Sequence, residues 1–260
     1  MSDLTRETFF SLYRSAAEGV PCLGSLPADP LSDETAEKLF RIADRLIDNG
    51  RRFNLTAILE PAEIVRKHIL DSLIPLALMI EQGIPVGEGV GADEILDVGT
   101  GAGFPLLPWA AVLPEDGVIL TGLDATGKKI AHIRESAKYA GLSNVRAVQA
   151  RAEDAARGPM RESFPVVTAR AVASMPVLLE LCAPFTARAG FFAALKAKSA
   201  DEEIASAARA AKELGLGEPD ILRYTLPGGD ERCLVLYKKR AATPRTYPRA
   251  YAEIAKHPLV

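Results

Sequence analysis

The segment "ILDVGTGAGFPLLPWAAVLP", residues 95–114, joins an apolar run, a glycine-rich turn and a second apolar run. The first run predicts a buried strand that ends at Asp97, and the second predicts a helix. The turn between them holds Gly99, Gly101 and Gly103. In open α/β sheets, ligands bind beyond the carboxyl ends of the strands. Because glycines leave the backbone open and the start of a helix offers unpaired N–H groups, the segment predicts a ligand site.

A carboxylate follows at the end of the next predicted strand. The run "GVILTGLDA" places Asp124 21 residues after Gly103. A carboxylate at this position can accept hydrogen bonds from both hydroxyls of a ribose. The turn and Asp124 together predict a nucleoside site. A turn whose glycines serve only tight packing is the alternative, and Asp124 argues against it.

The spacing of the glycines bears on which nucleoside binds. Dinucleotide folds favour GxGxxG, with a pyrophosphate at the start of the helix. Here the pattern is GxGxG, and the bulky Phe104 and Pro105 follow directly. This pattern favours S-adenosylmethionine, whose amino-acid end would lie against the turn without any pyrophosphate. An NAD-dependent oxidoreductase is the alternative.

Short apolar runs alternate with helical segments from residue 94 onward, which predicts crossover helices and a mostly parallel sheet. The predicted strands cover residues 94–99, 117–125, 144–150, 165–171 and 190–196. The predicted helices cover residues 106–113, 127–141, 175–190 and 199–215, with a short piece after Glu153. The chain then continues with "ILRYTLP" and "RCLVLYKK", joined by "GGDE" without a helix. We therefore expect an α/β fold whose sheet ends in an antiparallel pair, which favours a methyltransferase over a dehydrogenase.

The first 82 residues predict helices. Ser32 is a plausible N-cap for a helix whose apolar residues recur at helical spacing, namely Leu39, Ile42, Ala43, Leu46 and Ile47. A second helix over residues 60–83 has Ile64, Ile69, Leu73, Leu76 and Ile80 as core candidates. Its His68 and Asp71 lie on one face and either line a substrate mouth or form a structural surface pair. With a turn at 83–93, we expect a helical region (1–90), an S-adenosylmethionine-binding domain (91–240) and a basic C-terminal tail (241–260).

Composition excludes several classes of protein. The 260 residues are 48% hydrophobic, which is enough for a sizeable core. The start, "MSDLTRETFF", has no apolar signal region, and the longest apolar run, 73–80, is too short to span a bilayer. Three widely spaced cysteines and three scattered histidines argue against a disulfide framework and a metal site. We expect a cytoplasmic protein without a metal.

The net charge of −3 is unevenly distributed, because residues 238–260 hold six basic residues and one acidic residue. Five of the basic residues lie within twelve positions: Lys238, Lys239, Arg240, Arg245 and Arg249. Such a cluster suits contacts with the phosphates of a polyanion such as RNA, although charge alone favours a solvated tail. In the competing interpretation, Tyr247, Pro248 and Leu259 pack back on the body of the protein.

Several segments in order resemble one family, the bacterial small-subunit (16S) ribosomal RNA methyltransferase G, also called glucose-inhibited division protein B. They are "FNLTAI" (53–58), "RKHILDSL" (66–73), "DVGTGAGFPLLP" (97–108), "LDATGKK" (123–129), "NVRAVQARAED" (144–154), "VTARAVAS" (167–174), "FFAALKAKSADEE" (191–203) and "TPRTYPR" (243–249). The resemblance implies a Rossmann-like, class I S-adenosylmethionine-dependent methyltransferase. It implies methyl transfer to N7 of a guanine in the decoding-centre loop of 16S rRNA, which gives 7-methylguanosine. The implied partner is 16S rRNA or the small ribosomal subunit, with no membrane and no obligate protein partner.

The resemblance also implies where the cofactor lies. The family's contacts fall on Gly99, Phe104, Asp124, Ala125, Thr126, Ala152, Glu153 and Arg170. With Gly101 and Gly103, these residues are the predicted cofactor site. The chain departs from the family at Leu106, where glycine is common, and at Ala125, where serine is common. No catalytic residue is expected, because guanine N7 is a lone-pair acceptor without a proton.

Three other functions stay open at this point. A methyltransferase of the same fold could act on a small molecule, with the N-terminal helices as a lid, although such an enzyme has no use for a basic end. An NAD-dependent oxidoreductase and a non-enzymatic RNA-binding module are the others. The glycine turn with its downstream aspartate makes the last of these the weakest.

Overall fold

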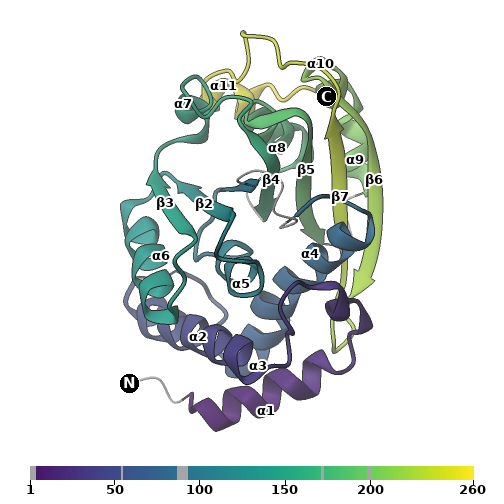
Figure 1. Cartoon of the computed structure of the whole chain (residues 1–260). Helices are drawn as coiled ribbons and strands as arrows, with labels where there is room; N and C mark the ends of the chain where they lie inside the picture. The colour runs from purple at the N-terminus through teal and green to yellow at the C-terminus, as the bar shows by residue number, and fades with distance from the viewer. Residues whose placement is uncertain (1–3, 54, 87–92, 171–172, 198–200) are drawn as a thin grey trace.

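The computed structural model describes residues 4–53, 55–86, 93–170, 173–197 and 201–260 (Figure 1). Most of the turn expected at 83–93 lies outside the described residues, and so do small parts of three segments that carry the family resemblance. These are Asn54 of "FNLTAI", residues 171–172 of "VTARAVAS" and residues 198–200 of "FFAALKAKSADEE".

Seven strands of the described residues form one sheet, in the order β3-β2-β1-β4-β5-β7-β6. They are β1 (Asp93–Val98), β2 (Val118–Asp124), β3 (Val145–Gln149), β4 (Phe164–Arg170), β5 (Thr186–Ala197), β6 (Leu216–Thr225) and β7 (Glu231–Lys239). β1 to β5 pair in parallel, and β7 is antiparallel to both β5 and β6. The prediction of a mostly parallel sheet with a terminal antiparallel pair is confirmed.

The N-terminal part of the chain is helical, as predicted. Its elements are α1 (Arg6–Ala17), the 3₁₀ turn η1 (Pro21–Ser25), α2 (Asp33–Phe53), α3 (Pro61–Ile64), the π-helical turn η2 (Val65–Leu70) and α4 (Asp71–Glu81). Ser32 caps α2, since its Oγ accepts the Thr35 N–H at 3.2 Å. The segment expected to be one helix over 60–83 is instead interrupted by η2, which places His68 and Asp71 at the junction with α4.

The remaining helices are α5 (Leu106–Val112), α6 (Gly127–Ala140), α7 (Ala152–Ala155), α8 (Met175–Cys182), α9 (Asp201–Ser206), α10 (Ala208–Glu213) and α11 (Tyr251–Lys256). Two predicted helices were too long. The helix expected over 175–190 ends at Cys182, because Pro184 cannot continue it, and β5 begins at Thr186. The one expected over 199–215 is two short helices, α9 and α10.

Neighbouring residues of the strands feed two apolar clusters, one on each face of the sheet. On β1, Ile95 joins the cluster with α1, α2, α4, α5 and α6, while Leu96 joins the cluster with α8, α10 and α11. Figure 1 shows the N-terminal helices gathered on one side of the molecule and α7, α8, α10 and α11 on the other. The predicted core positions of α2 and α4 are buried except Ile80, which is half-buried. The helical region thus shares a core with the sheet, and its boundary at residue 90 stays a prediction.

One edge of the sheet collects the ends that matter for ligand binding. Because β1 to β5 are parallel, Asp124, Arg170 and Ala197 all end strands at the same edge. β7 starts at this edge, since Arg232 pairs with Ala197. It therefore ends at the opposite edge, where Lys239 pairs with Leu216.

This topology overturns part of the prediction for the basic tail. Lys239 is 1% exposed and its Nζ donates to the carbonyls of Ala183 (2.8 Å) and Leu214 (3.0 Å). Arg249 is also engaged within the protein, with Glu180. The prediction of an RNA contact was wrong for these two residues. The competing interpretation, that the segment packs on the body, is supported by buried Pro248 and Leu259.

Candidate active site

The glycine turn joins the end of β1 to α5. Gly99, Gly101 and Gly103 have φ of 70°, 58° and 89°, which glycine adopts without strain. A Cβ on Gly101 would meet nothing closer than the Gly99 carbonyl at 3.7 Å, whereas one on Gly103 would lie 2.5 Å from Leu107 Cδ1. Gly101 thus keeps the turn open, while Gly103 lets α5 pack closely. Gly101 and Gly103 are therefore required for different structural reasons.

Asp124, at the end of β2, holds the turn from the other side. Its carboxylate accepts the N–H groups of Gly101 (3.2 Å) and Thr126 (2.8 Å), and Lys129 Nζ lies 3.4 Å away. A carboxylate has about four acceptor positions and these contacts use three of them, so about one position remains for a ligand hydroxyl. Asp124 can therefore serve the turn and a ribose together.

A cavity of about 170 Å³ opens beside this turn, and we call it the nucleoside cavity. Five predicted residues line it: Gly99, Asp124, Ala125, Ala152 and Glu153. Leu181 of α8 and Tyr251 of α11 line it as well, and the sequence did not indicate either of them. Their segments carry no nucleotide-binding pattern, so only the fold could bring them here.

Asp97 lies beneath the turn and is fully buried. Among the described residues, neither of its carboxylate oxygens has a hydrogen-bond partner. Burial raises the pKa of Asp97 to about 7. A buried carboxylate without a hydrogen bond, under an open turn, suits a positively charged group. S-adenosylmethionine carries two such groups, the sulfonium and the α-ammonium of its zwitterionic amino-acid end. These residues therefore fit that cofactor.

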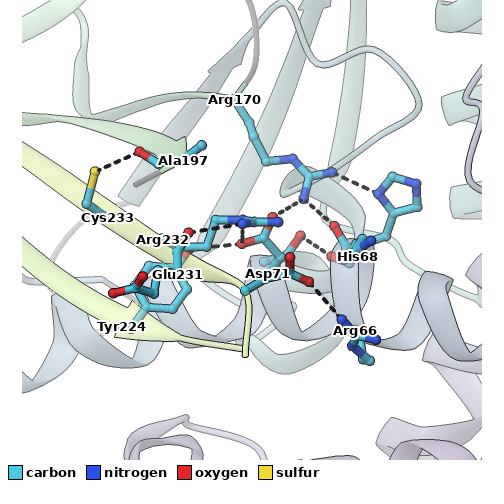
Figure 2. A network of polar contacts seen from close by, with 12 residues as sticks. Arg66, His68, Asp71, Arg170, Ala197, Tyr224, Glu231, Arg232 and Cys233 are labelled. Atoms are coloured by element: carbon cyan, nitrogen blue, oxygen red, sulfur yellow. Dashed lines mark hydrogen bonds and ion pairs between the residues drawn. The ribbon is translucent and has the colours of Figure 1, made fainter. Parts of the chain in front are cut away.

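Phe104 and Arg170 were predicted to contact the cofactor; neither lines the nucleoside cavity, so this stays a prediction. The Phe104 ring stacks on His68, with ring centroids 4.7 Å apart, and the Arg170 guanidinium lies 5.6 Å from the Phe104 centroid. Arg170 meets His68 Nδ1 (3.2 Å) and donates to Asp71 Oδ2 (3.3 Å), as Figure 2 shows. His68 and Asp71 are thus linked through Arg170.

Asp71 is the centre of this network. The Tyr224 hydroxyl donates to its Oδ1 at 3.0 Å, and Arg232 Nε lies 3.4 Å from the same oxygen (Figure 2). Burial raises the pKa of Asp71, and Arg170 and Arg232 oppose that rise. Burial and the Arg170 charge lower the pKa of His68 to about 3, so its imidazole is neutral at physiological pH. The network joins α4 to β4, β6 and β7.

A second cavity, of about 470 Å³, lies against this network, and we call it the basic cavity. Its ionisable lining residues are Lys67, His68, Asp71, Arg170, Lys196, Glu203 and Arg232. Four cations face two carboxylates among these described residues, so the cavity suits an anionic ligand. Lys196 Nζ is held by the Ala173 carbonyl and by Glu203, each at 2.7 Å. Lys67, Lys196 and Glu203 stand in segments that resemble the family, but no pattern in the sequence assigned them a role.

The described residues contain neither a membrane-spanning helix nor a metal-holding cluster of side chains. None of the helices there is both long and apolar enough to cross a membrane. No cluster of three or more His, Cys, Asp or Glu side chains there could hold a metal ion.

Comparisons with known proteins give a consistent result. The family model described as rRNA small subunit methyltransferase G matches residues 35–222. A protein of Desulfitobacterium hafniense named ribosomal RNA small subunit methyltransferase G is 40% identical over 232 residues, which cover 88% of this chain and 92% of that protein. One of the same name from Clostridium perfringens is 36% identical and covers 96% and 99%.

A comparison of folds agrees with the architecture. The O-methyltransferase of Bacillus cereus, solved in complex with S-adenosylhomocysteine, has a TM-score of 0.54 and 18% identity, with coverage of 90% of this chain and all of that one. At this identity the likeness concerns the fold alone.

Proposed function

This chain belongs to the rRNA small subunit methyltransferase G family, and we propose that it transfers the methyl group of S-adenosylmethionine to N7 of a guanine in the decoding-centre loop of 16S rRNA. Family membership argues against an NAD-dependent oxidoreductase, a small-molecule methyltransferase and a non-enzymatic RNA-binding module. One observation carries the assignment of sites. Both cavities are lined by residues at the same edge of the sheet: Gly99 of the glycine turn lines the nucleoside cavity, and Phe104, which follows the turn, stacks on His68 of the basic cavity.

The nucleoside cavity is proposed to hold the cofactor. The remaining acceptor position of Asp124 serves a ribose hydroxyl, and Ala152 and Glu153 border the base. Within the described part of the chain, the buried Glu153 carboxylate makes no hydrogen bond or ion pair, so it can accept the adenine amino group. The methionine part lies over Gly99 and Gly101, and Asp97 beneath them offsets its positive charge. When bound, the cofactor supplies an electrophilic methyl group.

The basic cavity is proposed to receive the RNA. Its cations suit the phosphates that flank the target, and phosphate contacts position a nucleic acid whatever its bases are. Arg170 lines this cavity beside the Phe104 ring, and a base plane can stack on its guanidinium. The target guanine would thus reach the methyl group from the side of Arg170.

The protein's chemical task is positioning. Guanine N7 has an in-plane lone pair and no proton, so attack on the methyl group needs no general base. The neutral His68 and the salt-bridged Asp71 are consistent with this, because neither is poised to move a proton at neutral pH. Holding N7 in line with the methyl group is the contribution expected of the surrounding side chains.

The proposed function is tested by transfer of a labelled methyl group to small subunits and 16S rRNA that lack the modification. We expect one modified guanine in the decoding-centre loop. A matched RNA fragment in which that guanine is 7-deazaguanine removes the acceptor atom and leaves the base-pairing edge intact. Equal labelling of the 7-deaza fragment would contradict N7 as the target.

A further inference from the structure

The last twenty residues are fastened to the body of the protein. The Arg161 guanidinium donates to the carbonyls of Thr243 (2.8 Å) and Tyr247 (2.9 Å). Arg157 donates to the Pro248 carbonyl at 3.0 Å. These bonds hold the segment along the loop that follows α7, so its path is fixed before α11 begins.

A buried ion pair fixes the start of α11 itself. Arg249 Nε and Nη2 donate to the two oxygens of Glu180 at 2.9 and 2.6 Å, and the Arg249 N–H donates to Glu180 at 2.9 Å. Glu180 is 0% exposed, so this two-pronged pair is shielded from water. On the other side, Ile254 and Leu259 are buried in the cluster formed with α8. Arg249 and Ile254 thus hold Tyr251 from both directions.

Tyr251 lies between these anchors and lines the nucleoside cavity. Its side chain is 43% exposed, although large apolar side chains on this protein are mostly buried. Leu181 lines the same cavity from α8, and Ala152 and Glu153 line it from α7. An aromatic ring on a firmly held segment is therefore left partly open at the cavity where a purine is expected.

We propose that Tyr251 covers the adenine ring of the cofactor, so that the C-terminal segment is a wall of the cofactor site. The proposal rests on the proposed function, since it assigns the adenine to this cavity. Stacking of an aromatic side chain on a base is a favourable contact that does not depend on base identity. Arg249 and Glu180 then act as positioning residues, because they place Tyr251 without touching the ligand.

The test compares Tyr251→Ala, Tyr251→Phe and wild type by calorimetric titration with S-adenosylhomocysteine and with 5′-methylthioadenosine, which lacks the amino-acid end. Tyr251→Ala is expected to bind both ligands roughly 5- to 100-fold more weakly, by the same factor, because both carry the adenine. Tyr251→Phe is expected to keep wild-type affinity. Equal affinity of Tyr251→Ala and wild type for both ligands would overturn the proposal.

Tyr139→Ala is the matched control, because Tyr139 is similarly exposed, at 40%, and lies on α6 away from the cavity. It is expected to bind both ligands like wild type, and a thermal melt of each variant reports on folding. A weaker affinity of Tyr251→Ala for S-adenosylhomocysteine alone would also overturn the proposal, since it would place Tyr251 at the amino-acid end. Failure of wild type to bind S-adenosylhomocysteine would instead contradict the proposed function.

Discussion

The two cavities at the carboxyl edge of the sheet are built in different ways. Most of the nucleoside cavity comes from the ends of three neighbouring strands, and each end carries a short local pattern. The basic cavity takes its charged residues from η2, α4, β4, β5, α9 and β7, which lie far apart in the sequence. Under the proposed function, the site for a cofactor shared by many enzymes is built from local motifs, whereas the site for a particular RNA is assembled by the fold.

The largest effect is expected from Gly101→Val, which acts on the nucleoside cavity. Gly101 has φ of 58° and open space where a Cβ would stand, so a valine there is strained and obstructs the ligand. We expect S-adenosylhomocysteine binding to fall below detection in a titration, while RNA binding persists. Gly141→Val is the control, since Gly141 has φ of 73° and equally open space but ends α6. Both substitutions share a strain of about 1–2 kcal/mol, and loss of binding in both would attribute the effect to strain alone.

Asp71→Ala tests whether the wall of the basic cavity also stabilises the fold. The change leaves the nearly buried Arg170 and Arg232 without their shared carboxylate. Breaking a buried pair in this way costs about 3–5 kcal/mol in the free energy of unfolding. Chemical denaturation measures it, with Asp71→Asn as the variant that keeps the shape. A loss below about 1 kcal/mol for Asp71→Ala would show that the network does not hold α4 to the sheet.

The titration of the buried Asp97 makes the stability of the protein depend on pH. Its pKa of about 7, against an ordinary 3.8, means that the folded protein keeps a proton which the unfolded chain releases. The free energy of unfolding attributable to Asp97 therefore falls as the pH rises from about 4 to about 7. We expect Asp97→Asn to be more stable than wild type at pH 8, by on the order of 2–4 kcal/mol, and equally stable at pH 4.

The same carboxylate makes a prediction about binding. The α-ammonium group of S-adenosylhomocysteine favours ionised Asp97, so wild-type affinity for this ligand should rise as the pH approaches and passes 7. Asp97→Asn should bind more weakly and without that rise, whereas RNA affinity should follow the same pH course in both proteins. If the free energies of unfolding of Asp97→Asn and of wild type change in parallel with pH, Asp97 does not titrate as described.

The smallest effect concerns Lys67 at the rim of the basic cavity. Lys67→Gln removes one cation that is 31% exposed and ion-paired with Glu63. If Lys67 contacts one phosphate, the slope of log affinity for RNA against log salt should decrease by about 0.7–0.9. Lys138→Gln, an exposed lysine in the last turn of α6, is the control and should leave the slope unchanged. Identical slopes for the two variants would remove Lys67 from the RNA contacts.

Features built from local sequence patterns could be predicted from the sequence, whereas features that join distant segments could not. The alternation of strands and helices, Asp124 and the glycines are all local features of the sequence, so the mostly parallel sheet with its antiparallel pair and five lining residues of the nucleoside cavity were predictable. Tyr251 was not, because its position depends on Arg249 finding Glu180, 69 residues away in the chain. The basic tail was misjudged since net charge does not reveal that Lys239 ends an antiparallel strand at the far edge of the sheet. Phe104 and Arg170 stay predicted cofactor contacts, and their packing with His68, which no local pattern indicates, joins them to the wall of the basic cavity.

The proposed function requires that the two cavities bind two different substrates. A crossed titration tests it most directly, with Asp124→Ala altering the nucleoside cavity and Arg232→Ala altering the basic cavity, each titrated with S-adenosylhomocysteine and with the 16S rRNA substrate. Asp124→Ala is predicted to lose about 1–3 kcal/mol of affinity for S-adenosylhomocysteine and to keep its RNA affinity. Arg232→Ala is predicted to show the reverse. If either folded variant loses affinity for both ligands alike, or Arg232→Ala weakens only S-adenosylhomocysteine binding, the assignment of the two cavities is contradicted.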